Sequence, residues 1–252
     1  MSNIDSPYLL VDLAYRAIKD DILTKQLVPG KKIVVHDLSQ RYQISETPIK
    51  QALNRLITEG LVESIPRRGV TIKKLTLKGL RDMMQARRMI ELFAVPQILQ
   101  KAKEEPQFVD ILNENTCQLE ESLKTASASD YYAKQNQLDT QFHVLLVGTL
   151  ENEKISEIYS HLGTHLVVFY LYGVKQMERF LESLEEHKEI LRAVRNLDRK
   201  ELEEALLHHL DMTEADSQKN LTQVLKNCSV FDPDKISCTG KYPPALSVSS
   251  RS

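Results

Sequence analysis

Residues 26–72 constrain the fold of this chain more than any other segment, because turn signals and helical patterns follow one another there without a gap. Pro29-Gly30 marks a turn, and residues 35–42 then carry apolar side chains four positions apart, which predicts a short helix. A turn at residues 43–45 ends that helix. The segment therefore begins as one helix followed by a tight turn.

A second helix is predicted directly after this turn. Thr47 can cap it with Pro48 at the first helical position, where a missing backbone N–H costs nothing, although Ser45 is a rival cap. Gly60 ends the helix. The apolar residues that recur at helical spacing, and should face a small core, are Ile49, Ala52, Leu53, Leu56 and Ile57. The two helices and their turn have the order of a helix-turn-helix.

A basic hairpin follows the second helix. Leu61-Val62 and residues 70–72 have the pattern of two short strands. The tip between them, residues 66–69, contains Arg67 and Arg68. Because a hairpin in this position is the wing of a winged helix-turn-helix, we predict that fold for the amino-terminal part.

The side chains left exposed on this fold have the chemistry of a DNA-binding surface. Lys, Gln and Asn pair well with base edges in the major groove, and arginines at a glycine-hinged tip suit phosphates or the minor groove. A solvated helix and an ordinary basic turn would also explain such residues, but the complete series of elements favours DNA. The predicted DNA contacts are Ser45, Thr47, Lys50, Gln51, Asn54, Arg55, Arg67, Arg68 and Gly69.

The same segment resembles the GntR family of bacterial transcription regulators. In that family a Pro-Gly turn precedes a Val-Ser-Arg-Thr-Pro-Val-Arg-Glu-Ala-Leu stretch, and the wing contains Arg-Gly. The matching residues here are Pro29-Gly30, residues 44–53 and Arg68-Gly69. The resemblance implies a winged helix-turn-helix that binds double-stranded DNA.

Departures from the family pattern fall on the exposed face of the second helix. Glu46, Lys50 and Asn54 each stand where the family usually has an arginine. A carboxylate near DNA phosphates should weaken binding or change the operator sequence. The resemblance therefore implies DNA binding without implying the family's usual operator.

The charge distribution agrees with a DNA-binding part joined to a part that does not bind DNA. Residues 1–75 contain 12 Lys and Arg against 8 Asp and Glu, a net +4, whereas the remainder contains 21 against 27, a net −6. The first residues lack the pattern of a secretion signal. The longest apolar stretch, residues 166–174, is much shorter than the roughly 20 residues that span a bilayer. We therefore expect a cytoplasmic protein without membrane association.

The rest of the chain has helical periodicity throughout. About six helices are predicted. The first covers residues 76–103, the second begins at residue 106, the third ends near residue 150, and the last three cover residues 153–172, 176–195 and 198–225. Asp198 and Glu201 form a capping box at the start of the last helix. The predicted domains are a winged helix-turn-helix at residues 8–75, an all-helical bundle at 76–226 and a flexible tail at 227–252.

Four metal-ligating side chains can converge within the helical domain. Asp139 and His143 are four residues apart and share a helix face. His187 and His209 lie at similar distances, roughly 15 to 18 Å, from the turn at Leu197 between two antiparallel helices. One carboxylate and three imidazoles suit a divalent metal such as zinc, nickel or manganese, with positions left for water or an organic acid.

Spacing alone leaves other interpretations open. A helical histidine is more often a surface or core residue than a metal ligand. His161 and His165 also stand four apart and form a competing pair, whereas His208 points about 100° away from His209 around the helix.

The helical part resembles the ligand-binding FCD domain of the FadR-type branch of the GntR family. The resemblance rests on residues 87–91, 139–143, 186–191 and 208–210. It implies a metal held by Asp139, His143, His187 and His209. It also implies that Arg87 holds a carboxylate effector, although Arg87 could equally form an ordinary helix ion pair with Glu91.

Together these features predict a ligand-responsive transcription regulator, a repressor that binds a near-palindromic operator as a homodimer. A small organic acid would enter the metal-containing helical pocket and change the spacing of the two DNA-binding parts. Two alternatives stay open: a metal-dependent enzyme that acts on a small acid and carries an appended DNA-binding segment, and a regulator whose metal is purely structural. No general base of the His-Glu-x-x-His kind stands beside the predicted ligands, so no catalytic residue is predicted.

Overall fold

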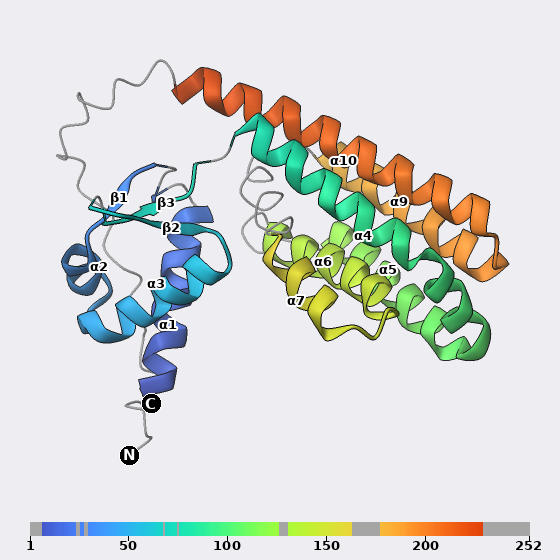
Figure 1. Cartoon of the computed structure of the whole chain (residues 1–252), viewed down its shortest axis with the longest axis horizontal. Helices are drawn as coiled ribbons and strands as arrows, with labels where there is room; N and C mark the ends of the chain where they lie inside the picture. Colours follow the sequence, from blue (N-terminus) through green and yellow to red (C-terminus); the bar gives the residue numbers. More distant parts are fainter. Residues whose placement is uncertain are drawn as a thin grey trace. The chain divides into compact units, whose positions relative to one another are not determined.

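The computed structural model describes residues 7–23, 26–27, 30–67, 69–74, 76–125, 131–162 and 177–228. The chain divides into two compact units: of the described residues, the first contains those up to Lys74 and those from 223 to 228, and the second contains those between 75 and 222. In the described residues the first unit combines helices with a small sheet and the second is helical (Figure 1). This confirms the predicted fold class, a winged helix-turn-helix followed by an all-helical bundle.

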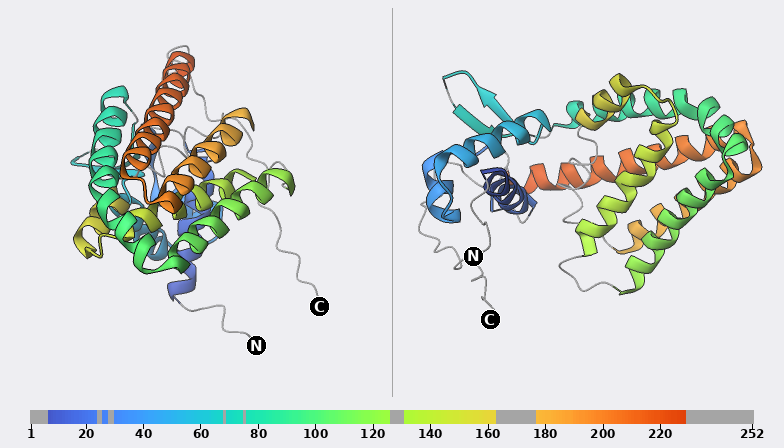
Figure 2. Two further views of the ribbon diagram at one scale, coloured as in Figure 1. Left: turned by 90° about the vertical axis from the view of Figure 1, so that its right-hand side faces the viewer. Right: turned by 90° about the horizontal axis from the view of Figure 1, so that it is seen from below.

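The first unit packs three helices against a three-stranded antiparallel sheet. Its helices are α1 (Pro7–Leu23), α2 (Val35–Tyr42) and α3 (Glu46–Thr58). Its strands are β1 (Lys32–Ile33), β2 (Val62–Ile65) and β3 (Gly69–Ile72), in the order β1-β3-β2. Figure 2 shows β2 and β3 projecting from the helices as a hairpin, which is the predicted wing.

The turn between α2 and α3 depends on one left-handed residue. Gln43 has a φ of 56°, and its N–H bonds to the carbonyl of Ser39. Helix α3 then begins at Glu46 with Ser45 at its N-cap, so the prediction of Thr47 as the cap was wrong. The helix boundary differs by two residues, because Ser45 and Thr47 can both cap a helix.

Helix α1 and strand β1 were not predicted from the sequence. A signal for α1 exists, because Ala14, Ile18 and Ile22 recur every four residues and are fully buried. They pack with the buried side of α3, which consists of Pro48, Ile49, Ala52, Leu53 and Leu56. Strand β1 has only two residues, which is too short for an alternating pattern.

The second unit is a bundle of helices, which Figure 2 shows from two sides. Its described helices are α4 (Leu77–Glu104), α5 (Pro106–Thr125), α6 (Tyr131–Gly148), α7 (Glu153–His161), α9 (Met177–Asn196) and α10 (Arg199–Cys228). The main core joins α4, α5, α6, α9 and α10 through fully buried residues such as Ile98, Leu112, Phe142, Ile190 and Leu206.

Caps define two of these helices. Thr76 accepts the N–H of Gly79 at 3.0 Å at the start of α4, and Asp198 accepts the N–H of Glu201 at 2.9 Å before α10. This is one half of the predicted capping box, because the Glu201 carboxylate accepts from Arg192 and Asn196 and the N–H of Asp198 bonds to the carbonyl of Ala193. Helix α10 continues through Cys228, past the expected start of a tail at residue 227. The rest of that tail and the predicted helix beyond residue 162 lie outside the described residues.

No helix in the described part of the chain has the length and apolarity to cross a membrane.

A buried carboxylate ties α1 to α2, and we expect its loss to destabilise the first unit. Asp21 is 9% exposed and accepts hydrogen bonds from Arg41 at 2.8 Å and from the Tyr42 hydroxyl at 2.5 Å. Asp21→Ala should lower the free energy of unfolding by about 2 kcal/mol, because both donors lose their acceptor. Urea denaturation with hydrogen exchange of α1 and α2 peptides measures this. Asp37→Ala, which removes an exposed carboxylate of α2, should lower the free energy of unfolding by only a few tenths of the loss expected for Asp21→Ala. Equal losses in the two variants would contradict the stabilising role of Asp21.

Candidate metal centre and DNA-binding surface

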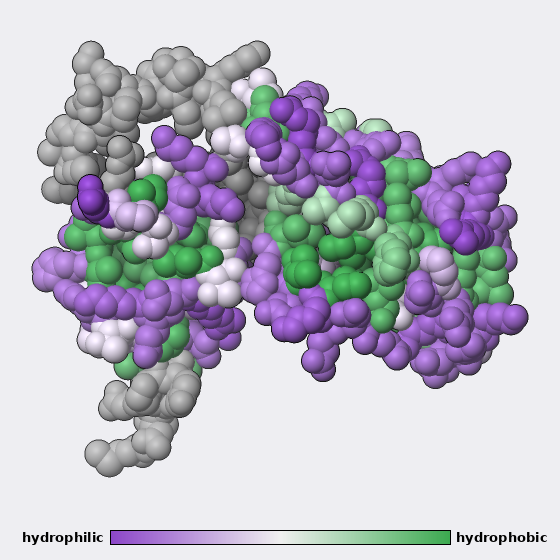
Figure 3. All heavy atoms as spheres, viewed as in Figure 1, coloured by the Kyte–Doolittle hydropathy of each residue, from purple (hydrophilic) through white to green (hydrophobic). Residues whose placement is uncertain are grey.

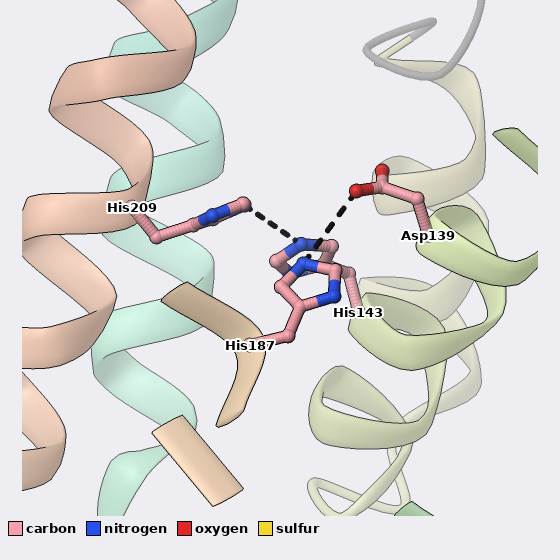
Figure 4. A group of neighbouring side chains, drawn as sticks. All are labelled: Asp139, His143, His187 and His209. Atoms are coloured by element: carbon pink, nitrogen blue, oxygen red, sulfur yellow. Dashed lines mark hydrogen bonds and ion pairs between the residues drawn. The ribbon is translucent and has the colours of Figure 1, made fainter. Parts of the chain in front are cut away.

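Three helices bring one aspartate and three histidines together inside the bundle. Asp139 and His143 come from α6, His187 from α9 and His209 from α10, and one ligand atom of each lies within 4.8 Å of all the others (Figure 4). The three imidazoles are 0 to 1% exposed, whereas the Asp139 side chain is 18% exposed. The helix geometry thus produces the convergence that the spacing predicted.

Two buried carboxylates orient two of the rings. Glu91 Oε2 lies 3.0 Å from Nδ1 of His143, and Glu186 Oε2 lies 2.8 Å from Nδ1 of His209. Because an ionised carboxylate can only accept hydrogen bonds, each Nδ1 must donate one, and the neutral ring then carries its lone pair on Nε2. Both Nε2 atoms therefore face the middle of the cluster.

The middle of the cluster has the chemistry of a cation site. The Nε2 atoms of His143 and His209 lie 3.1 Å apart, where two lone pairs repel unless a proton or a metal ion stands between them. Both nitrogens of His187 are buried without a hydrogen-bond partner among the described residues, and its Nε2 is 3.5 Å from Asp139 Oδ1. Three imidazoles and a carboxylate suit a divalent transition metal. These four residues could hold such an ion.

The electrostatics favour the metal-binding forms of the side chains. Burial and the neighbouring His209 hold the pKa of His187 well below its ordinary value. Burial, opposed by the hydrogen bond to Glu186, lowers the pKa of His209 to about 4. Burial acts to raise the pKa of Asp139, but His187, His143 and Arg87 outweigh it and hold that pKa below its ordinary value. Neutral imidazoles and an ionised carboxylate are the states in which these groups ligate metals.

Arg87 forms the ordinary helix ion pair that the sequence left open. Its Nε lies 2.5 Å from Glu91 Oε1, and the Tyr159 hydroxyl donates to the same oxygen at 2.8 Å. The side chain is 1% exposed, yet its Nη2 has no hydrogen-bond partner among the described residues. Arg87 therefore keeps one donor for an anion while Glu91 offsets its charge.

The space beside Asp139 is small. A cavity of about 10 Å³ is lined by Leu119, Gln135, Asn136, Asp139, Phe180 and Ser183. That volume holds roughly one water molecule. This cavity, as the described residues line it, does not admit an organic acid.

Glu186, Glu91 and Arg179 were not assigned a role at the cluster from the sequence alone. Arg179 donates hydrogen bonds to Glu186 through two nitrogens, at 2.6 and 3.0 Å. Both side chains are buried, so this ion pair belongs to the core. Glu186 stands next to His187 in the chain, but its partner is His209 on another helix. Only the tertiary contact reveals that role.

The remaining histidines lie apart from the cluster. His161 is exposed at the end of α7 and His208 is exposed on α10. His165, the other member of the competing pair, lies outside the described residues. Within the described residues the structure favours the set of Asp139 with three histidines.

On the first unit, most predicted DNA contacts are exposed. The exposed residues are Ser45, Thr47, Lys50, Gln51, Asn54, Arg55, Arg67 and Gly69, whereas Arg68 lies outside the described residues. Arg67, at the wing tip, has a φ of 66°. The surface expected from the sequence is therefore available to a partner.

The guanidinium of Arg55 contacts two residues of α1 as well as Glu59 at the end of α3. Its guanidinium lies 3.1 Å from Asp12, 3.4 Å from Glu59 and 3.9 Å from the ring centre of Tyr15. These contacts direct Arg55 towards α1 and offset its charge. They make Arg55 the weakest of the predicted DNA contacts.

Comparison with known proteins agrees with both halves of this description. A family model described as "Bacterial regulatory proteins, gntR family" matches residues 10–72, and one described as "FCD domain" matches residues 82–212. The chain belongs to the GntR family of bacterial transcription regulators and carries an FCD domain. It is thus a transcription regulator with an effector-binding domain.

Relatives and solved structures support the same assignment. The chain is 26% identical over 206 residues to the uncharacterized HTH-type transcriptional regulator YdhC of Bacillus subtilis, covering 82% of this chain and 89% of YdhC. It is 22% identical over 196 residues to the HTH-type transcriptional repressor RspR of Escherichia coli, covering 78% and 83%. The structure of E. coli McbR/YncC matches with a TM-score of 0.63 at 19% identity, covering 86% of this chain and 98% of that one. This structural likeness shows the shared fold.

The carboxylates behind the histidines yield a prediction about metal affinity. Glu91→Gln and Glu186→Gln should each weaken binding of added zinc by roughly 10- to 100-fold, because a neutral amide is a weaker acceptor than a carboxylate and its NH2 end can turn towards Nδ1 and favour the other tautomer. Competition with a chromophoric chelator measures the affinity, and circular dichroism verifies the helices. Glu189→Gln, at an exposed position of the same helix as Glu186, is the matched control. Unchanged affinity in both folded variants would contradict the role given to these carboxylates.

Proposed function

We propose that this regulator is a cytoplasmic repressor that binds a near-palindromic operator as a homodimer and responds to a small organic acid at a metal centre. One observation carries the proposal. A winged helix-turn-helix shares its chain with a buried cluster of one aspartate and three histidines, beside an unpartnered guanidinium nitrogen. A DNA-binding surface and a candidate anion site in one chain suit a ligand-controlled switch.

The DNA-binding part of the proposal assigns α3 to the major groove and the hairpin of β2 and β3 to the flanking backbone or minor groove. The assigned contacts are Ser45, Thr47, Lys50, Gln51, Asn54, Arg67, Arg68 and Gly69, with Arg55 kept as a secondary one. Exposure and side-chain chemistry support this set.

The sensing part assigns zinc, nickel or manganese to Asp139, His143, His187 and His209. Four protein ligands leave positions open on a metal that takes five or six, and a carboxylate effector would occupy them. The buried Nη2 of Arg87 supplies a charged donor for the same effector. The protein senses the acid without turning it over, in line with its membership of a regulator family.

The small cavity beside Asp139 gives the switch a physical basis. Because this cavity holds only about 10 Å³ between the described residues that line it, we expect an acid that binds there to select an arrangement in which the surrounding helices have moved apart. The cluster and its partners come from α4, α6, α9 and α10, so such a movement reaches four helices. Control of DNA binding requires that the acid bind the two arrangements with different affinity.

A charge-free stripe on α4 supports the homodimer. Met89 and Phe93 are 69% and 63% exposed, and Gln85, Pro96 and Gln100 extend the same face. Figure 3 shows hydrophobic residues gathered on the face of the helical unit that carries α4 and α7. Interface cores are depleted of charge and enriched in aromatic residues and methionine. A second copy offers the same stripe, so a two-fold axis would pair it with itself.

The sensing proposal predicts an acid response that depends on the metal and on Arg87. A thermal-shift screen of sugar acids, hydroxy acids and dicarboxylates should find an acid that stabilises the zinc-loaded protein and weakens its operator binding roughly tenfold in a gel-shift assay. Chelation, or Arg87→Gln, should abolish that shift, whereas Arg192→Gln, at an exposed arginine of α9, should keep it.

Three results would count against this response. No effect of any acid on operator binding, together with lower thermal stability of His143→Ala, would indicate a structural metal. Consumption of the acid by the metal-loaded protein would indicate an enzyme. A response that survives chelation would place the effector elsewhere.

The dimer proposal predicts a charge-sensitive assembly. Phe93→Asp should convert the dimer to a monomer in light-scattering measurements and lower operator affinity, because two carboxylates would face each other in an apolar contact. Ile111→Asp, at a 46% exposed apolar position of α5, should leave the mass of the dimer unchanged. A dimer that tolerates Phe93→Asp would locate the interface on another surface.

A further inference from the structure

Glu46, the first residue of α3, places an acidic group on the surface that the proposed function assigns to DNA. Its Oε2 accepts a hydrogen bond from Lys50 Nζ at 2.9 Å, and its Oε1 lies 3.6 Å from His36 Nδ1 on α2. The side chains of Glu46 and Lys50 are 44% and 59% exposed. The carboxylate is therefore held from two sides while the pair stays open to a partner.

A carboxylate on such a surface is favourable only opposite particular bases. B-DNA carries one negative charge per roughly 1.7 Å of its axis, so an isolated carboxylate is repelled. Pairing with Lys50 removes the net charge. A carboxylate has only acceptors, and the hydrogen-bond donors on base edges in the major groove are the amino groups of cytosine and adenine. Glu46 can therefore bind favourably only to a base that presents an amino group in the major groove.

The pair as a whole matches one base pair better than the others. Glu46 and Lys50 present an acceptor beside a donor, and a C·G pair presents the cytosine amino group beside guanine O6, with guanine N7 as a second acceptor for Lys50. In an A·T pair the amino group lies next to the N7 acceptor of adenine, which repels a carboxylate, and thymine offers O4 alone. The chemistry therefore favours C·G.

We propose that Glu46 and Lys50 together recognise one C·G base pair in each operator half-site, which makes Glu46 a specificity-determining residue. The inference rests on the proposed function, in which α3 lies in the major groove. In helix-turn-helix proteins the first residues of the recognition helix contact base edges, and Glu46 and Lys50 are the first and fifth residues of α3. His36, held by Gln40 at 2.9 Å, limits the movement of the carboxylate.

Selection from a pool of randomised duplexes by the full-length protein tests the proposal. The wild-type protein should select a C·G pair at one position of each half-site and should bind the selected duplex roughly tenfold more tightly than duplexes changed at that position. Glu46→Ala should bind with the preference at that position reduced to about twofold or less. Glu46→Gln should shift the preference to A·T, because a Gln amide pairs with adenine N6 and N7.

A charge control separates recognition from repulsion. Asp37→Asn also removes one exposed negative charge from the first unit and should alter affinity for all duplexes alike while keeping the C·G preference. The proposal is overturned if Glu46→Ala tightens binding to every duplex equally and keeps the wild-type preference at every position. It is also overturned if the wild-type protein selects a site without the C·G pair. Failure of the wild-type protein to retain any duplex at low salt would instead overturn the proposed DNA binding itself.

Discussion

The bundle depends on two buried carboxylates, each of which accepts hydrogen bonds from an arginine and from a histidine. Glu91 accepts from Arg87, Tyr159 and His143, and Glu186 accepts from Arg179 and His209. An ion taken out of water costs several kcal/mol unless its partners are close and well oriented, so removal of one partner leaves an uncompensated charge in the core. The carboxylates in turn set the tautomer of two histidines and leave their lone pairs facing each other. The candidate metal centre is thus a consequence of how the core charges are paired.

Helix α4 links the separate parts of the proposed switch. It carries Arg87 and Glu91 beside the cluster, and Met89 and Phe93 on its exposed side. It also begins at Leu77, three residues after the end of the first unit at Lys74. Under the proposed function, a change at the cluster would act on the same helix that bears the apolar stripe and follows the first unit in the chain. One helix can couple these sites without a long pathway of side chains.

The elements found by sequence pattern share one property, which is that their signal is local. The periodicity of α3, the capping of α10 by Asp198 and the four-residue spacing of Asp139 and His143 all lie within one or two helical turns. The failures have local causes as well. Ser45 and Thr47 are competing caps of similar strength, and β1 is too short to show a period. Helix α1 has a usable pattern as well, because Ala14, Ile18 and Ile22 repeat every four residues and are fully buried.

By itself, the sequence determined the fold class, the order of the elements and the residues able to ligate a metal, because helical period and side-chain chemistry are properties of neighbouring residues. Tertiary structure alone decided which of those residues meet. It paired Glu186 with His209 rather than with its neighbour His187, turned Arg55 towards Asp12 and Tyr15, and left Nη2 of Arg87 without a hydrogen-bond partner in the described part of the chain. Such contacts join residues tens of positions apart, and their distances depend on how helices pack, which no local pattern records.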